Sequence, residues 1–268
     1  MRVATETRSR LRQELDSALE REEFRLHYQP IIDLRTGSRV GLEALIRWQH
    51  PERGLLHPDA FISFAEDSAQ VVPIGSWVLG TACRETAGLG TDAHLSVNVS
   101  ARQLQHPALL DTVKDALRSS GLAPARLILE ITETATLTDL RDVVATLHQL
   151  QSLGVRIALD DFGTGYSPLS YLQQLPVDYL KVDRSFVRSM TTHREDAAIV
   201  RGVVEMAHAL GMLAVAEGVE HAEQLALLQD MGCDLAQGYL WMPPVPVEQL
   251  GRTIVVPEPR SAAGAMRR

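Results

Sequence analysis

Two adjacent aspartates, Asp160 and Asp161, are the residues of this sequence best placed to do chemistry. They lie in the stretch VRIALDDFGTGYS (residues 155–167), after a short apolar run and before a loop bracketed by glycines. Such a run predicts a buried β-strand that delivers both carboxylates at its carboxyl end. Neighbouring carboxylates repel each other unless a cation lies between them. The same pattern is also ordinary turn chemistry, in which Asp side chains accept bonds from backbone N–H groups.

Acidic and amide side chains follow other apolar strands in the same way. On five predicted strands, the residues at or just after the strand ends are Glu43, Asn98, Glu130, Asp160, Asp161 and Glu217. Burying an unpaired carboxylate is very costly, so one or two divalent cations are the economical explanation. All these donors are oxygens, which favours Mg²⁺ or Mn²⁺ over zinc. Two ions bridged by one aspartate suit in-line attack on a phosphodiester, and Lys181 is suited to orient a water or offset phosphate charge.

Each of these residues also has a structural interpretation. Asn98 could be a hydrogen-bonded amide at a strand end, and Lys181 and Glu217 could form an ion pair with each other. Glu133 and Glu220 could be acids at helix N-termini, where the helix dipole favours them. The histidines, among them His27, His50 and His57, are scattered and are interpreted as structural or surface residues.

Eight predicted strands, separated mostly by helices, must position these residues. The strands are expected at residues 24–28, 40–45, 94–100, 127–132, 155–160, 179–183, 213–217 and 235–239, and the helices at 11–19, 58–67, 74–89, 109–120, 140–153, 167–175, 196–210 and 223–231. This count predicts an α/β fold, a modified TIM (β/α)₈-type barrel. The first two strands are joined by only about ten residues, which is short for a parallel crossover. We therefore expect the first strand, ending at Gln29-Pro30, to be antiparallel.

Composition bounds the class of protein. The 268 residues are 45% hydrophobic and 22% charged, as in a soluble globular protein. We expect an N-terminal helix in residues 1–22, one barrel domain over 23–256 and a flexible tail over 257–268. The net charge of −8 argues against a polynucleotide-binding surface, and Cys83 and Cys233 lie too far apart in sequence for a disulfide framework. Without a secretory signal or an apolar run long enough to span a bilayer, the segment is expected to be cytoplasmic and not in a membrane.

Eight stretches together resemble the EAL domain family, bacterial phosphodiesterases that open cyclic di-GMP. They are YQPI (28–31), GLEALIRW (41–48), LSVNVSARQL (95–104), LEITET (129–134), ALDDFGTGYS (158–167), YLKVDRSFV (179–187), AEGVE (216–220) and QGYLW (237–241). The resemblance covers about residues 11–250. Three departures stand out: Pro168 where a serine is more usual, Ala69 where a glycine is more usual, and Trp241-Met242-Pro243 in place of an aromatic-polar-Arg run.

The resemblance implies roles for individual residues. One metal ion would be held by Glu43, Asn98, Glu130 and Asp160, with Asp160 shared and Asp161 on a second ion. Glu217 would lie near the second ion and the attacking water, as ligand or general base, and Lys181 would position that water. Arg47 would clamp a phosphate of the ligand. The other implied ligand contacts are Gln29, Leu45, Asp183, Gln237 and Glu220.

The resemblance also implies a homodimer, in which Glu133 holds the loop 162–167 that joins catalysis to dimer formation. The resulting hypothesis is a Mg²⁺- or Mn²⁺-dependent hydrolase, with two ions per site, that converts cyclic di-GMP to linear pGpG. One alternative is a catalytically silent cyclic di-GMP receptor or protein-interaction module. Another is a barrel metalloenzyme acting on sugars or carboxylates, since fold alone does not fix function. These residues include no sensor or cyclase-like domain, and a regulatory domain or partner protein is therefore possible.

Overall fold

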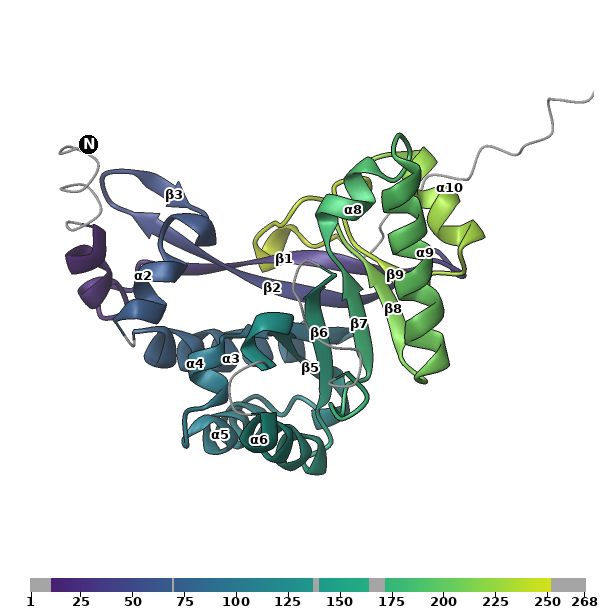
Figure 1. The fold of residues 1–268 in the computed structure, drawn as a ribbon. Coiled ribbons are helices and arrows are strands. Elements are labelled where there is room, and N and C mark those ends of the chain that lie inside the picture. The colour runs from purple at the N-terminus through teal and green to yellow at the C-terminus, as the bar shows by residue number, and fades with distance from the viewer. Residues whose placement is uncertain (1–10, 69, 137–139, 164–171, 252–268) are drawn as a thin grey trace, which may run out of the picture.

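Nine strands, in the residues that the structure describes, form one sheet that closes on itself (Figure 1). The computed structural model describes residues 11–68, 70–136, 140–163 and 172–251. The strands are β1 (Phe24–Asp33), β2 (Arg39–His50), β3 (Gly54–Leu56), β4 (His94–Val99), β5 (Leu127–Thr132), β6 (Arg156–Phe162), β7 (Tyr179–Val182), β8 (Leu213–Ala216) and β9 (Leu235–Ala236). Their order is β1-β9-β8-β7-β6-β5-β4-β2-β3, and pairing of β1 with β2 closes eight of them into a barrel.

The first strand runs against its neighbours. β1 pairs antiparallel with both β2 and β9, whereas every pairing from β2 through β4 and on to β9 is parallel. β3 is a short hairpin partner of β2 outside the closed barrel. The predicted α/β barrel with an antiparallel first strand is therefore confirmed.

β1 and β2 are longer than expected. The prediction that the first strand ends at Gln29-Pro30 is wrong, because β1 continues to Asp33. Tyr28 donates its backbone N–H to the Val245 carbonyl at 2.7 Å, on the side away from β2. Backbone N–H groups two residues apart on a strand point the same way, so the backbone nitrogen of Pro30 also points away from β2. The N–H that Pro30 lacks would therefore not have bonded to β2. β2 likewise runs past the barrel to His50, so Arg47 lies on the strand and not beyond it.

Helices cover the outside of the barrel (Figure 1). They are residues 11–18, α2 (Ile62–Asp67), α3 (Val71–Gly88), α4 (Ala101–Leu104), α5 (Leu109–Ser120), α6 (Leu140–Ser152), α8 (Arg184–Ser189), α9 (Arg194–Ala209) and α10 (Ala222–Asp230), with 3₁₀ turns at Pro58–Ala60, Pro124–Arg126, Glu133–Thr136 and Val247–Gln249. α4, α8 and β3 were not predicted, since each is too short to show a periodic apolar pattern. The part of the chain that the structure describes contains no helix with the length and apolar character needed to cross a membrane.

Some predictions concern residues outside the part of the chain that the structure describes. The described residues do not include Ala69, Pro168, most of the helix expected at 167–175, or the tail 257–268. In the N-terminal helix, Leu11 and Leu15 are buried in the same core cluster as the barrel, which is the packing its amphipathic pattern predicts. The three domain boundaries stay a prediction.

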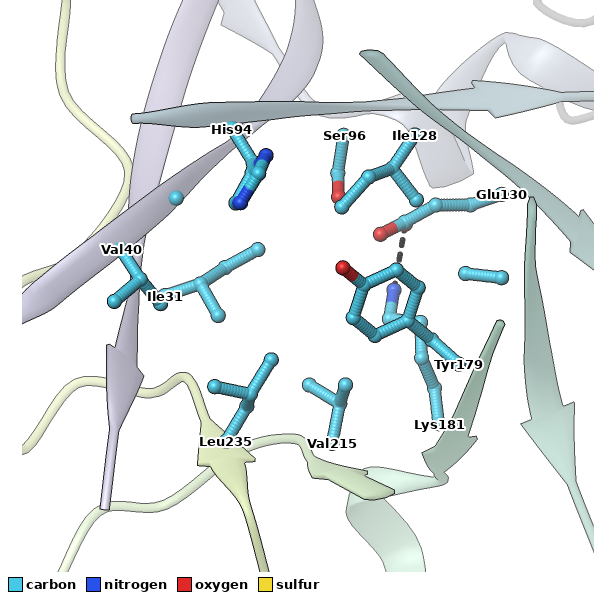
Figure 2. A pocket seen from close by; sticks show the side chains of 12 residues that line it. Ile31, Val40, His94, Ser96, Ile128, Glu130, Tyr179, Lys181, Val215 and Leu235 are labelled. Carbon is cyan, nitrogen blue, oxygen red and sulfur yellow. Dashed lines mark hydrogen bonds and ion pairs between the residues drawn. The ribbon is translucent and has the colours of Figure 1, made fainter. Parts of the chain in front are cut away.

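Apolar side chains fill the amino-terminal end of the barrel. Figure 2 shows Ile31, Ile128, Val215 and Leu235 projecting from four strands into the same pocket as the ion pair of Glu130 and Lys181. The space that remains is about 20 Å³, close to the room that one water needs. A ligand therefore approaches the polar groups from the opposite, carboxyl end of the strands.

Candidate active site

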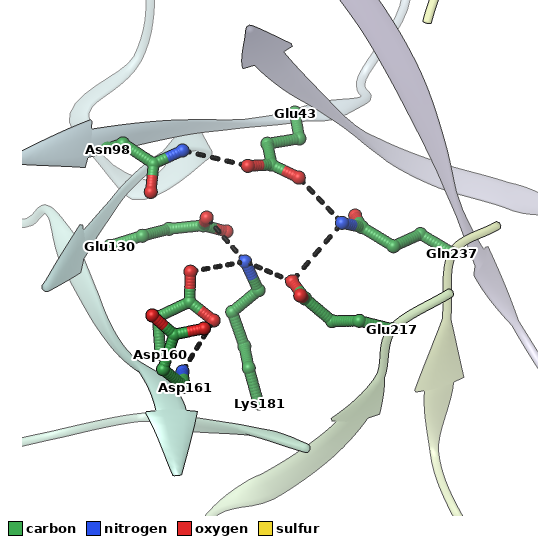
Figure 3. A network of polar contacts seen from close by, with 8 residues as sticks. All are labelled: Glu43, Asn98, Glu130, Asp160, Asp161, Lys181, Glu217 and Gln237. Atoms are coloured by element: carbon green, nitrogen blue, oxygen red, sulfur yellow. Dashed lines mark hydrogen bonds and ion pairs between the residues drawn. The ribbon is translucent and has the colours of Figure 1, made fainter. Parts of the chain in front are cut away.

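A polar network lies at the carboxyl end of the barrel (Figure 3). The parallel strands all end on this side, so residues far apart in sequence meet there. The network joins Glu43 of β2, Asn98 of β4, Glu130 of β5, Asp160 and Asp161 of β6, Lys181 of β7, and Glu217 and Gln237 just after β8 and β9. These include all six predicted metal ligands.

Lys181 lies at the centre of the network. Its Nζ is 2.6 Å from Glu130 Oε2, 3.1 Å from Asp160 Oδ2 and 2.5 Å from Glu217 Oε1. The Lys181 side chain is 1% exposed, so all three donors of the ammonium are used inside the protein. The ion pair between Lys181 and Glu217 that the sequence left open is present, as part of this larger cluster.

Glu43 is held by two amides. Asn98 Nδ2 donates to Glu43 Oε1 at 2.8 Å, and Gln237 Nε2 donates to Glu43 Oε2 at 2.6 Å. The same Gln237 nitrogen lies 3.2 Å from Glu217 Oε1. Gln237, predicted as a ligand contact, therefore bridges two carboxylates, one from β2 and one from the end of β8. Its own Oε1 is buried and has no hydrogen-bond partner among the described residues.

A backbone irregularity brings Asp160 and Asp161 together. Successive side chains of a regular strand point to opposite faces. Here the pairing of β6 with β7 shifts register between Leu159 and Phe162, and Asp161 has φ of 57°, in the left-handed region. The Asp161 N–H donates to Asp160 Oδ1 at 2.8 Å. The irregularity lets both carboxyl groups face the site, where Figure 3 shows them next to each other.

The site is short of positive charge. Burial raises the pKa of Glu130 well above its usual range, with only Lys181 opposing the rise, and burial raises the pKa of Glu217 to about 8. For Asp161, burial and the neighbouring Asp160 raise the pKa. Burial alone would lower the pKa of Lys181, but the surrounding carboxylates outweigh it and raise that pKa instead. The ammonium is therefore held charged while the acids around it are only partly compensated.

The residue types in the network fit divalent cations, but the present arrangement of their side chains is not that of a metal site. Across the described residues, no three His, Cys, Asp or Glu side chains are already arranged to hold a metal ion. Lys181 Nζ occupies the middle of the cluster, and the nitrogen of Asn98 faces Glu43. The chemistry nevertheless fits: every candidate ligand offers oxygen. Five carboxylates against one ammonium also leave four negative charges, the charge that two divalent ions would balance.

The β1–β2 pair carries predicted ligand contacts beside the cluster. Gln29 is paired with Glu43, and by the two-residue alternation Leu45 and Arg47 lie on the same face of β2 as Glu43. Gln29 Nε2 donates to the carbonyl of Met242 at 3.3 Å. The run Trp241-Met242-Pro243, which differs from the usual family sequence, therefore contacts Gln29 through its backbone. Arg47 is 5% exposed, and burial lowers its pKa.

Three other predicted residues lie at the edge of the site. Glu133 is buried, and its Oε2 accepts the Gly163 N–H at 3.2 Å, at the start of the loop it was predicted to hold. Residues 164–167 of that loop lie outside the described residues. Asp183 caps α8 by accepting the Ser185 N–H at 2.9 Å. Glu220 is exposed, and the contact found for it is its backbone N–H donating to Gln224 Oε1 at 2.8 Å.

Tyr239 is a residue that the sequence reasoning passed over. It is 62% exposed, the most exposed of the large hydrophobic side chains described. It lies two residues after Gln237 and close enough to Arg47 to raise the pKa of that guanidinium. Its signal in the sequence was an aromatic residue directly after a glycine at a strand end.

Comparisons with known proteins agree with this geometry. The model of the EAL domain family matches residues 12–244. The bifunctional diguanylate cyclase/cyclic di-GMP phosphodiesterase MucR of Pseudomonas aeruginosa is 42% identical over 254 residues, which are 93% of this chain and 37% of MucR. The cyclic di-GMP phosphodiesterase NbdA of the same organism is 43% identical over 244 residues, 90% of this chain and 31% of NbdA. This chain thus spans about a third of these relatives.

A solved structure extends the likeness to three dimensions. The PaMucR phosphodiesterase in its c-di-GMP complex superimposes with a TM-score of 0.87 at 43% sequence identity. The match covers 90% of this chain and 100% of that one.

Proposed function

This chain belongs to the EAL domain family, and on that premise we propose that it is a cyclic di-GMP phosphodiesterase. It would hydrolyse one 3′,5′-phosphodiester bond with two Mg²⁺ or Mn²⁺ ions and release linear pGpG. The observation that carries this proposal is the set of five carboxylates gathered around a single ammonium at the open end of the barrel. Such a cluster is costly to bury and has an evident use only where cations bind.

The metal ligands in this proposal come from five strands. They are Glu43, Asn98, Glu130, Asp160, Asp161 and Glu217, with Asp160 shared between the two ions. Bound ions would polarise the phosphodiester, lower the pKa of the attacking water and stabilise the leaving oxygen.

Lys181 and Glu217 would manage the attacking water. In the structure the three Nζ–H groups of Lys181 are used by three carboxylates. Ions bound to those carboxylates would compete for their oxygens, which would free an N–H group of Lys181 to orient a water oxygen. Glu217 Oε1 lies 2.5 Å from that nitrogen, close enough to accept a proton from a water held there. Glu217 would act either as a metal ligand or as the general base that takes the water's proton on its carboxylate.

The ligand would be held mainly by residues around Arg47. The planar guanidinium can bind two oxygens of a phosphate at once, and its partial burial strengthens that bond. The other proposed ligand contacts are Gln29, Leu45, Asp183, Gln237 and Glu220. Of these, Asp183 already caps α8 and Glu220 is exposed, so their use would require the ligand to reach the rim of the site.

Three features of the whole protein remain proposals of the same kind. They are a homodimer coupled to the site through Glu133 and the loop 162–167, a cytoplasmic location, and control by a regulatory domain or partner. The contact between Glu133 and Gly163 supports the part of the first proposal that links Glu133 to the loop.

The test is a chromatographic assay of cyclic di-GMP with purified protein, with and without chelator. We expect pGpG to form in Mg²⁺ or Mn²⁺, chelator to stop the reaction, and Glu43→Ala to abolish it. Glu205→Ala, on the exposed face of α9, is the matched control and should leave turnover unchanged. Full activity of Glu43→Ala would refute the metal model. Binding of cyclic di-GMP without hydrolysis would identify a receptor instead, and turnover of an unrelated substrate alone would identify a different barrel enzyme.

A further inference from the structure

Gly238 lies flat against the backbone of Val219, with no room for a side chain. A Cβ at position 238 would lie 2.0 Å from the Val219 carbonyl oxygen and 2.3 Å from its nitrogen. The φ of Gly238 is outside the left-handed region, so lack of space, and not backbone conformation, requires the glycine here. Because the opposing atoms are backbone, no change of rotamer can relieve the contact.

This contact joins the two loops that carry Glu217 and Gln237. Backbone hydrogen bonds run from Gln237 N to Ala216 O at 2.9 Å, from Val219 N to Gln237 O at 3.1 Å and from Leu240 N to Val219 O at 3.0 Å. Gly238 lies between the second and third of these bonds. The loop after β8 and the loop after β9 therefore form one junction, whose spacing is set at Gly238.

Gln237 converts this spacing into the geometry of the carboxylates. Its Nε2 is 2.6 Å from Glu43 Oε2 and 3.2 Å from Glu217 Oε1, and the residue is 5% exposed. Raising a 2.0 Å contact to the 3.0 Å that real Cβ atoms keep would move the loops apart by about 1 Å. A displacement of that size takes Nε2 out of hydrogen-bond range of one carboxylate or the other.

We propose that Gly238 is a positioning residue, which acts through Gln237 to hold Glu43 and Glu217 at a fixed separation. As far as it concerns catalysis, this inference rests on the proposed phosphodiesterase function. A misplacement of about 1 Å can cost about 100-fold in rate. Gly238→Ala should therefore lower kcat by about 100-fold and change KM less, since Arg47, the main proposed phosphate contact, lies on β2 outside the junction.

The experiment combines kinetics with a signal that needs no turnover. The side-chain amide of Gln237 is followed in ¹H–¹⁵N spectra and assigned by its loss in Gln237→Ala. Gly202→Ala is the matched control, because Gly202 lies exposed on α9 with nothing within 4 Å of an added Cβ. We expect the amide signal to move in Gly238→Ala by more than in Gly202→Ala. In the Gln237→Ala background, adding Gly238→Ala should cost less than about threefold in kcat, because the pathway is already broken.

Two results would overturn the proposal: an unmoved Gln237 amide signal in Gly238→Ala, or the same kcat loss with and without Gln237. If Gly238→Ala does not fold, Leu240→Pro perturbs the same junction at another contact, since it removes the N–H that donates to the Val219 carbonyl and sets the proline ring against that oxygen. It should move the same amide signal, and failure to do so also counts against the proposal. A wild-type protein that does not hydrolyse cyclic di-GMP refutes the proposed function, while the amide signal still decides the role of Gly238.

Discussion

Replacing Lys181 with methionine keeps the length and most of the packing of the side chain but removes the one cation at the centre of the site. Three contacts are lost, to Glu130 at 2.6 Å, Asp160 at 3.1 Å and Glu217 at 2.5 Å. Lys181 and Glu130 are 1% and 2% exposed, so water does not replace the lost partner. The remaining acids must then protonate or stay buried with their charge unbalanced.

The structure sets the size of the effect. Breaking a buried ion pair by removing one partner costs about 3–5 kcal/mol of unfolding free energy. For a chain of this size each kcal/mol lowers Tm by about 2–4 °C, so Lys181→Met should unfold on the order of 10 °C below the wild type in chelator. Divalent ions would supply the missing charge. Adding Mn²⁺ should therefore raise Tm by more in Lys181→Met than in the wild type.

The assay is thermal unfolding of both proteins in chelator and in Mn²⁺. Lys114→Met is the matched control, because Lys114 pairs with Asp111 at 3.2 Å but is 47% exposed. A surface pair contributes about 0–1 kcal/mol, so this control should change Tm by only a few degrees. The reasoning fails if Lys181→Met unfolds with the wild type in chelator, or if Mn²⁺ stabilises both proteins equally.

Three shorter predictions follow from other contacts. In chelator, the free energy of unfolding should fall as pH rises from about 4.5 to about 8. Burial raises the pKa of Glu217 to about 8, so across this range the carboxyl ionises more readily in the unfolded chain than in the folded one. Urea unfolding across this range tests it, and a flat profile contradicts it. Glu133→Ala removes the bond to the Gly163 N–H and should lower turnover about tenfold; equal rates for Glu133→Ala and Glu205→Ala would count against a role in the loop. Pro30→Ala should lower the unfolding free energy by about 1–2 kcal/mol, because the Pro30 ring is buried and the change removes two of its CH₂ groups, while no bond to β2 is lost; an unchanged midpoint in urea unfolding would contradict this.

Local sequence patterns were enough to predict the barrel and its reversed first strand. Short apolar runs leading into Glu130 and Asp160 indicated the carboxyl ends of two strands to within two residues, since β5 ends at Thr132 and β6 at Phe162. The ten-residue connection after β1 was too short for a crossover, and chain length alone therefore predicted the antiparallel pair. Since parallel strands end on one side, the meeting of the acids followed from the fold.

Features that depend on contacts distant in sequence could not be predicted. The left-handed φ of Asp161 accompanies a register shift of β6 against β7, and nothing in the sequence Asp-Asp-Phe-Gly predicts it. The bridge from Gln237 to Glu43 spans 194 positions of sequence. The need for glycine at position 238 comes from the backbone of Val219, which packs against it only once both loops are in place. Each of these details depends on contacts between segments distant in sequence, which an apolar pattern does not specify.

The same charge imbalance underlies both the raised pKa values and the proposed use of this site. One ammonium is enough to let the strands close, because Lys181 satisfies three carboxylates at once. It is too little to neutralise them: burial first, and the neighbouring carboxylates second, still raise the pKa of both Glu130 and Glu217. A second lysine in the cluster would stabilise the empty protein but would remove the field that attracts divalent ions. On this argument, variants that stabilise the metal-free barrel by adding positive charge here should bind Mn²⁺ more weakly, in proportion to the stability gained.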